Sequence, residues 1–222
     1  MNIFIIRHSQ SEANLQNLLG GQGDYALSEQ GAKDARQVAE EFCEKLGYPI
    51  HRLISSPLRR AKETAAVFAQ VLGIRQIEEE ALLTEQGMGV YTGMSYDDLA
   101  TAPGYVHARN ERWDWQPQGG GESYRQVAER VSRFFGKLYA ETVPPRQAAR
   151  DSLQPKSGGP NMLIVSHAVC MRLIYGYLCD MFPRYLEPIP YNGEIWQVQN
   201  PEPHPQNQII RHHFGGSREA KA

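Results

Sequence analysis

Two histidines stand directly after short apolar segments that lie far apart in the chain. His8 follows Ile3–Ile6 and Arg7 in the stretch IIRHSQ, and His167 follows Leu163–Val165 in IVSHAV. In an open parallel sheet, ligands bind in a crevice at the carboxyl ends of the strands. A single histidine at such a place is more often a hydrogen-bonded structural residue. Two of them at equivalent strand ends favour one shared site.

Two arginines are expected to add positive charge to this crevice. Arg7 precedes the first histidine, and Arg59 lies in SSPLRRAKETA, at the start of a predicted helix whose free N–H groups also attract anions. Guanidinium groups bind phosphate oxygens in a bidentate manner. Two arginines and two histidines therefore predict a metal-free anion site in which one histidine is the nucleophile. The alternative for Arg59 and Arg60 is a solvated position on the helix surface.

Helices and strands alternate along the chain, and they must position these residues. Apolar residues at helical spacing predict helices around residues 35–46, 58–72, 124–138 and 169–178. Gly47 and Gly73 follow the first two helices as stop signals. Short apolar segments predict strands at 3–6, 51–56, 74–78 and 162–165, and two late segments around 195–198 and 209–213 predict a hairpin or edge pair. This order predicts the α/β class with a mostly parallel central sheet.

The composition is that of a globular protein, with 41% hydrophobic and 22% charged residues. A formal net charge of −2 argues against nucleic acid or an acidic membrane as a partner. No apolar run approaches the roughly 18 residues that cross a bilayer. The three cysteines have no CxxC spacing, which argues against a disulfide framework or a zinc knuckle and favours a reducing cytosol.

One domain is expected over residues 1–214, followed by a disordered tail at 215–222. Residues 84–121 are irregular and rich in glycine and proline, and such a long segment within a domain is typical of a lid or a binding loop. Residues 144–160 are polar and contain several prolines and glycines, so they are expected to form a surface loop.

Six segments in register, from residue 3 to about 179, resemble the histidine phosphatase superfamily, in the branch of cofactor-dependent phosphoglycerate mutases and related phosphatases. The first segment carries Arg7, His8, Glu12 and Asn14, and the others are GQGDYALSEQG, SSPLRRAKETA, LLTEQGMGVYTG, GGES and VSHAVCMR. The resemblance implies a three-layer α/β/α sandwich of the phosphoglycerate mutase-like kind. One departure is Ser9, where the family has glycine; its side chain is expected either to crowd a bound phosphate or to donate to it.

The resemblance also implies a role for each site residue. His8 becomes phosphohistidine, and Glu85 gives a proton to the departing oxygen before it takes one from the attacking water. Phosphate oxygens are held by Arg7, Arg59 and His167, and the phosphate-binding set is completed by Asn14, Gly21 and Ala168. No cofactor and no metal ion is expected.

These observations predict a histidine acid-type phosphatase, a cytoplasmic phosphomonoesterase that hydrolyses a small-molecule phosphate ester. The first alternative is a 2,3-bisphosphoglycerate-dependent phosphoglycerate mutase. Mutases have Tyr three residues past the acid and Lys about eleven past it, where this chain has Met88 and Tyr96. Arg109 and Arg112 lie near a third mutase position, and WDWQPQGGGES resembles the phosphatase branch, so the second anion-binding shell is mostly missing.

The second alternative is an inactive phospho-ligand-binding or regulatory module of the same fold. Such proteins usually lack one of the core histidines or arginines, and this chain has the complete set. The sequence leaves the oligomeric state open, a dimer included.

Overall fold

The central sheet is mixed, and the candidate site lies at the carboxyl ends of its parallel strands. The computed structural model describes residues 2–47, 49–142, 160–183, 189–198, 204–205 and 207–216, without the side chain of residue 142. Within these residues, one sheet has the strand order β3-β2-β4-β1-β5-β6. Its strands are β1 Ile3–Arg7, β2 Arg52–Ser55, β3 Ile77–Glu79, β4 Met162–Ser166, β5 Ile195–Val198 and β6 Ile209–His212.

Four neighbouring strands of this sheet run parallel, and the remaining two form the predicted hairpin. β1 pairs with β4, β4 with β2, and β2 with β3 in parallel. β5 pairs antiparallel with β1, and β6 antiparallel with β5. The predicted α/β class with a mostly parallel sheet is therefore confirmed.

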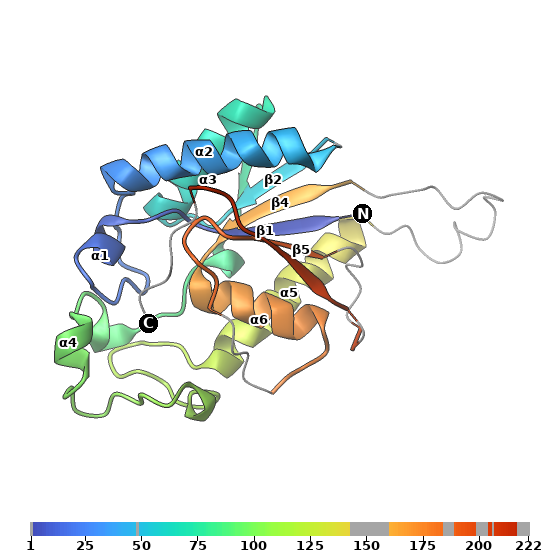
Figure 1. Cartoon of the computed structure of the whole chain (residues 1–222). Coiled ribbons are helices and arrows are strands. Elements are labelled where there is room, and N and C mark those ends of the chain that lie inside the picture. Colours follow the sequence, from blue (N-terminus) through green and yellow to red (C-terminus); the bar gives the residue numbers. More distant parts are fainter. Residues whose placement is uncertain are drawn as a thin grey trace.

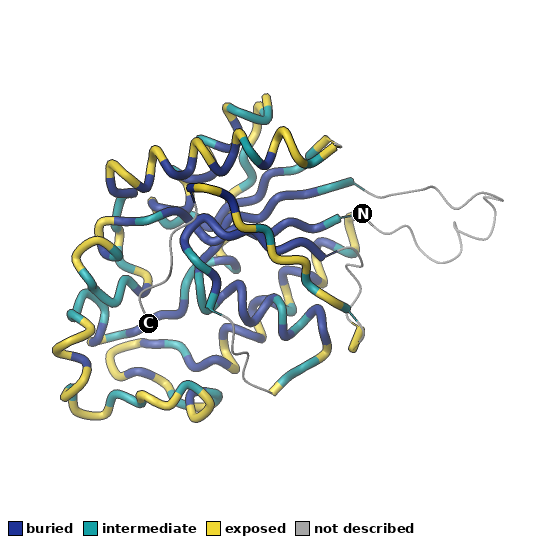
Figure 2. The backbone as a smooth tube through the Cα atoms, viewed as in Figure 1, coloured by how far each residue is buried: buried dark blue, intermediate teal, exposed yellow. Residues whose placement is uncertain are grey.

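Both faces of the sheet are buried, because successive strand residues point to opposite sides. In β1, Ile3 and Ile5 join one hydrophobic core, and Phe4 and Ile6 join the other. This explains why the first strand is continuously apolar instead of alternating with polar residues. Figure 2 shows β1, β4 and β5 as part of the buried centre of the molecule.

Two pairs of helices cover the two faces. The helices α2 (Glu29–Leu46) and α3 (Arg59–Leu72) pack on one face, and α5 (Tyr124–Thr142) and α6 (Ala168–Leu178) pack on the other (Figure 1). The result is the three-layer sandwich that the family resemblance implies.

The local signals that start and stop these helices act as the sequence indicates. Ser28 accepts a hydrogen bond from the Gly31 backbone N–H at 2.9 Å and so caps α2. Gly47 and Gly73 end α2 and α3 with φ values of 68°, a left-handed conformation that favours glycine.

The short helix α1 (Glu12–Leu15) and the segment 84–121 lie beyond the carboxyl ends of the parallel strands (Figure 1). The segment contains α4 (Tyr96–Leu99) and single 3₁₀ turns at Gly89–Tyr91 and Arg109–Glu111. Gly89 has a φ of 53°, and a Cβ atom there would lie 1.8 Å from the Gln118 carbonyl oxygen. The fold of this segment therefore requires glycine at position 89.

Some sequence predictions fall on residues that the structure does not describe, namely 144–159 of the surface loop and 217–222 of the tail. The structure describes the first two tail residues, and the disorder of the tail stays a prediction. The Gly215 N–H donates to Glu41 at 3.2 Å, and Gly216 is buried beside α2. In the part of the chain that the structure describes, no helix has the length and apolar character that would cross a membrane.

Candidate active site

The two histidines meet at the carboxyl ends of neighbouring strands. Arg7 at the end of β1 is in register with Ser166 at the end of β4, so His8 and His167 follow at equivalent positions. Their ring centroids are 5.1 Å apart. The side chains are 4% and 0% exposed. The structure thus brings the two histidines together as the strand-end pattern indicates.

A cavity of about 290 Å³ opens at the carboxyl ends of these strands. Among the residues singled out in the sequence, its wall includes Arg7, His8, Asn14, Gly21, Glu85 and Ala168. They come from the end of β1, from α1, from the loop after it, from the segment after β3 and from the first residue of α6. The topology gathers one small site from widely separated parts of the chain.

Hydrogen bonds fix the state of the His8 ring. Nδ1 lies 2.7 Å from the Ser9 carbonyl oxygen, which can only accept, so Nδ1 carries the proton. Nε2 accepts a hydrogen bond from Nε of Arg60 at 3.1 Å, so its lone pair is free of a proton. Burial, and then the charges of Arg60 and Arg7, hold the pKa of His8 well below its ordinary value. His8 is therefore a neutral imidazole, the nucleophilic form.

The second arginine of the site is Arg60, and the predicted placement of Arg59 in the crevice is wrong. The Arg59 side chain is 57% exposed and pairs with Glu63 at 2.8 Å. Arg60 is 3% exposed, and its Nη1 and Nη2 atoms donate to the carbonyls of Gly23 and Gly21 at 2.9 and 2.7 Å. Consecutive helix residues point about 100° apart, so only one of the two arginines can face the crevice.

A helical signal in the sequence distinguishes the two arginines. Arg59 and Glu63 form an i,i+4 pair of opposite charge, which is typical of a solvent-facing helix stripe. Arg60 shares its face with the buried Thr64, whose hydroxyl donates to the Arg60 carbonyl at 2.8 Å and accepts from the Ser9 N–H at 3.2 Å. Burial lowers the pKa of Arg60 to about 10, so it stays cationic at neutral pH.

Arg7 and His167 each keep a buried nitrogen without a hydrogen-bond partner among the described residues, Nε of Arg7 and Nδ1 of His167. Arg7 also donates from Nη1 to the Pro190 carbonyl at 2.8 Å, and Nε2 of His167 lies 2.7 Å from the Ser56 hydroxyl. Burial, and then the charges around it, lowers the pKa of His167 well below its ordinary value. An oxyanion bound beside Arg7 would supply the acceptor that its Nε lacks.

The Glu85 carboxylate lies at the N-terminus of α6. Its oxygens accept hydrogen bonds from the backbone N–H of Gln86 at 2.9 Å and from those of Val169 and Cys170 at 3.3 Å each. These bonds cap the helix that begins directly after His167. They also fix the direction of the carboxylate at the cavity wall.

Asn192 belongs to the site and was missed in the sequence. Its amide donates to the His8 carbonyl at 3.0 Å and to Oδ1 of Asn14 at 3.3 Å. The same Asn14 oxygen accepts from the N–H and the hydroxyl of Ser11 at 3.1 and 2.9 Å. The stretch PYNGE around Asn192 indicates only a turn, so no signal in the sequence connects it with His8.

The departure from the family motif at Ser9 has no visible consequence for the cavity. Ser9 is 1% exposed, and the cavity wall does not include it. Its hydroxyl has no hydrogen-bond partner among the described residues. Like His167, Ser9 is buried and is not part of the cavity wall, so its effect on a bound phosphate stays a prediction.

Side chains of the segment 84–121 supply much of the remaining cavity wall. They are mostly aromatic or cationic and include Tyr96, Tyr105, His107, Arg109 and Arg112. This segment, predicted as a lid or binding loop, therefore does line the site. Among the described residues, no group of three or more His, Cys, Asp or Glu side chains is placed to hold a metal ion.

A family comparison agrees with this arrangement. The model of the histidine phosphatase superfamily (branch 1) matches residues 3–199, which is most of the chain. The chain belongs to this superfamily. This superfamily is enzymatic and comprises phosphatases and mutases.

Similar proteins carry names of both types, and the solved structure among them shows likeness of fold. A 2,3-bisphosphoglycerate-dependent phosphoglycerate mutase of Parvibaculum lavamentivorans is 36% identical over 61% of this chain and 65% of its own length. A mutase of the same name from Methylobacterium radiotolerans is 31% identical over 78% of this chain and 76% of its own. The solved structure of a mycobacterial glucosyl-3-phosphoglycerate phosphatase with VO3 has a TM-score of 0.75 at 23% identity, covering 96% of this chain and 98% of that one.

Proposed function

We propose that this histidine phosphatase superfamily member is a phosphomonoesterase that acts through a phosphohistidine on His8. The observation that carries the proposal is the pair of hydrogen bonds on the His8 ring, from Nδ1 to Ser9 and from Arg60 to Nε2. They leave Nε2 unprotonated, with its lone pair in contact with a cationic group. That arrangement is what a nucleophile for a phosphate ester requires.

In the first step, Nε2 of His8 attacks phosphorus and the P–O bond to the alcohol breaks. Arg7, Arg60 and His167 hold the phosphoryl oxygens; the arginines neutralise their charge. Glu85, in its acid form, gives its proton to the departing oxygen. The products of this step are a free alcohol, a Glu85 carboxylate and phosphohistidine.

In the second step, water attacks the phosphohistidine. The Glu85 carboxylate takes a proton from this water as its oxygen bonds to phosphorus, and the P–N bond breaks. Inorganic phosphate leaves, His8 regains its free lone pair, and Glu85 is again an acid. No metal ion or cofactor takes part in either step.

A phosphoglycerate mutase is the second candidate, because two of the curated relatives named above carry that name. A mutase must bind a second anionic group next to the phosphate. Met88 and Tyr96 line the cavity where mutases have Tyr and Lys. Arg112 is engaged elsewhere, since it donates to the Val106 carbonyl at 2.8 Å and to the Tyr105 hydroxyl at 2.9 Å. Arg109 and Arg112 also line the cavity, so the argument for the phosphatase rests on Met88 and Tyr96.

The proposal includes a reducing, cytoplasmic location. All three cysteines are free of disulfides. The complete set of core residues around His8 also favours an enzyme over an inactive binding module.

A panel of small phosphomonoesters that includes 2- and 3-phosphoglycerate, each with and without 2,3-bisphosphoglycerate, tests the proposal. Release of inorganic phosphate is measured beside isomerisation, with His8→Ala as the control. We expect hydrolysis of at least one ester, none of it by the His8→Ala variant. Isomerisation of 3-phosphoglycerate faster than its hydrolysis would instead favour the mutase.

A further inference from the structure

The segment that carries Glu85 has no regular secondary structure of its own from residue 84 to 88. Its backbone polar groups are bound by side chains from elsewhere in the fold. Arg130 of α5 donates from Nη1 to the Leu82 carbonyl at 2.7 Å and from Nη2 to the Glu85 carbonyl at 3.0 Å. The Arg130 residue is 5% exposed, so these bonds are made away from water.

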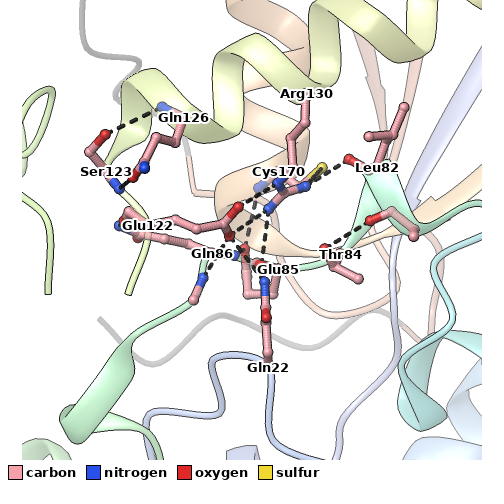
Figure 3. A network of polar contacts seen from close by, with 12 residues as sticks. Gln22, Leu82, Thr84, Glu85, Gln86, Glu122, Ser123, Gln126, Arg130 and Cys170 are labelled. Carbon is pink, nitrogen blue, oxygen red and sulfur yellow. Dashed lines mark hydrogen bonds and ion pairs between the residues drawn. The ribbon is translucent and has the colours of Figure 1, made fainter. Parts of the chain in front are cut away.

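Glu122 holds Arg130 in this position. Its carboxylate pairs with Nε and Nη2 of Arg130 at 3.0 and 3.1 Å, a bidentate arrangement that fixes the guanidinium plane (Figure 3). One carboxylate oxygen also accepts from the Gly87 N–H at 2.9 Å. The Glu122 backbone exchanges two more bonds with the segment, donating to the Gly87 carbonyl at 2.8 Å and accepting from the Gln86 side chain at 2.6 Å.

Gln22, in the loop after α1, joins this network. Its amide donates to the Glu85 carbonyl at 2.9 Å and to the Glu122 carboxylate at 3.0 Å (Figure 3). Gln22 lies between Gly21 and Gly23, whose carbonyls accept from Arg60. The loop that orients the phosphate-binding arginine is thus tied directly to the segment that bears the carboxylate.

We propose that Glu122, Arg130 and Gln22 are positioning residues that hold Glu85 within proton-transfer distance of the ester oxygen of a phosphate bound at His8. This inference rests on the proposed function, because it assigns Glu85 the proton transfer. The reason is geometric: a misplacement of about 1 Å in a reacting group can cost about 100-fold in rate. The N–H groups at the start of α6 hold the Glu85 carboxylate, whereas Arg130 and Gln22 hold the Glu85 backbone carbonyl.

The test compares two phosphate esters with leaving groups of different quality. An alkyl phosphate needs a proton on its departing oxygen, whereas p-nitrophenolate leaves well without one. We expect Glu122→Gln and Gln22→Ala to lower kcat/KM for the alkyl ester at least about tenfold more than for p-nitrophenyl phosphate. In the double variant with Glu85→Gln, neither substitution should add to this selective loss.

A matched control exists in the same helix. Arg125 of α5 pairs with Asp114 at 2.6 Å on an exposed surface. Asp114→Asn removes the charge of a carboxylate partner as Glu122→Gln does, and it should leave the ratio of the two kcat/KM values unchanged. Gln22 is an exposed side chain, so Gln22→Ala keeps the test available if Glu122→Gln does not fold.

The outcomes separate this inference from the proposed function. Equal losses for both esters in Glu122→Gln and Gln22→Ala would show a merely structural role and overturn the inference. A selective loss in Glu85→Gln with no selective loss in these two variants would overturn the positioning role alone. No selective loss in Glu85→Gln would remove the acid role of Glu85 and this inference with it.

Discussion

Nε of Arg60 lies 3.1 Å from Nε2 of His8, so the arginine proposed to bind the anion also contacts the proposed nucleophile. The guanidinium is held in this orientation by the carbonyls of Gly21 and Gly23. Its N–H donors therefore lie beside the proposed nucleophile before phosphate enters. Such preorganised donors cost no reorganisation during the reaction.

The two adjacent arginines therefore make a paired prediction. Arg60→Ala should lower kcat/KM for p-nitrophenyl phosphate by about 100-fold or more, the typical effect of losing one donor to transition-state charge. Arg59→Ala removes only an exposed ion pair and should change kcat/KM by less than about twofold. Similar losses in both variants, measured by steady-state kinetics, would contradict the placement of Arg60 at the phosphate.

The role of Glu85 predicts a dependence on the leaving group. Glu85→Gln keeps the size of the side chain but has no proton to give at neutral pH. Hydrolysis of an alkyl phosphate should fall by about 100-fold or more, the usual contribution of general acid catalysis. Phosphorylation of the enzyme by p-nitrophenyl phosphate, followed as the burst of p-nitrophenolate, should fall much less. If Glu85→Gln slowed the phosphorylation step equally for the alkyl phosphate and for p-nitrophenyl phosphate, Glu85 would be excluded as the acid.

The buried histidines predict a pH-dependent stability. The pKa values of His8 and His167 are lowered well below 6.5 by burial and by neighbouring positive charge. Below about pH 6.5 the unfolded chain therefore binds protons that the folded chain does not. The free energy of unfolding must decrease as the pH falls from 6.5, by up to about 1.4 kcal/mol per pH unit for each histidine.

Replacement of His167 by Gln should remove one histidine's share of this slope. Urea unfolding of the wild type and of His167→Gln at several pH values between about 5 and 7.5 measures it. Arg59→Ala serves as the control, because its exposed guanidinium is not among the groups that lower either pKa. A slope that is the same in all three proteins would show that His167 takes up its proton in the folded state.

Most of the fold could be predicted from the sequence, because the apolar spacing and the stop signals indicated the same helices and strands. Apolar stripes at helical spacing and glycine stops fixed α2 and α3, and continuous apolar runs marked β1 and β4 as strands buried on both faces. The segment 84–121 could be recognised as irregular and as a lid or binding loop, but its fold could not be predicted. Its fold depends on contacts such as that of Gly89 with Gln118, which no local propensity encodes.

Site residues could be predicted where strand ends determine them and not where a helix face or a distant loop does. His8 and His167 follow from the parallel register of β1 and β4. The choice between Arg59 and Arg60 depends on helix phase, and a one-residue error in the phase turns the side chain by about 100°. Asn192 reaches His8 across more than 180 residues of chain, so only the tertiary fold reveals it.

Trapping of the covalent intermediate is the most direct test of the central claim. The enzyme is mixed briefly with phosphate-labelled substrate, quenched in alkali, in which phosphohistidine is stable, digested and mapped by mass spectrometry. We expect one phosphate on Nε2 of His8 in the wild type, none in His8→Ala, and loss of the label when the sample is acidified. Label on a serine, cysteine or aspartate, or phosphate release by His8→Ala at the wild-type rate, would contradict the phosphohistidine mechanism.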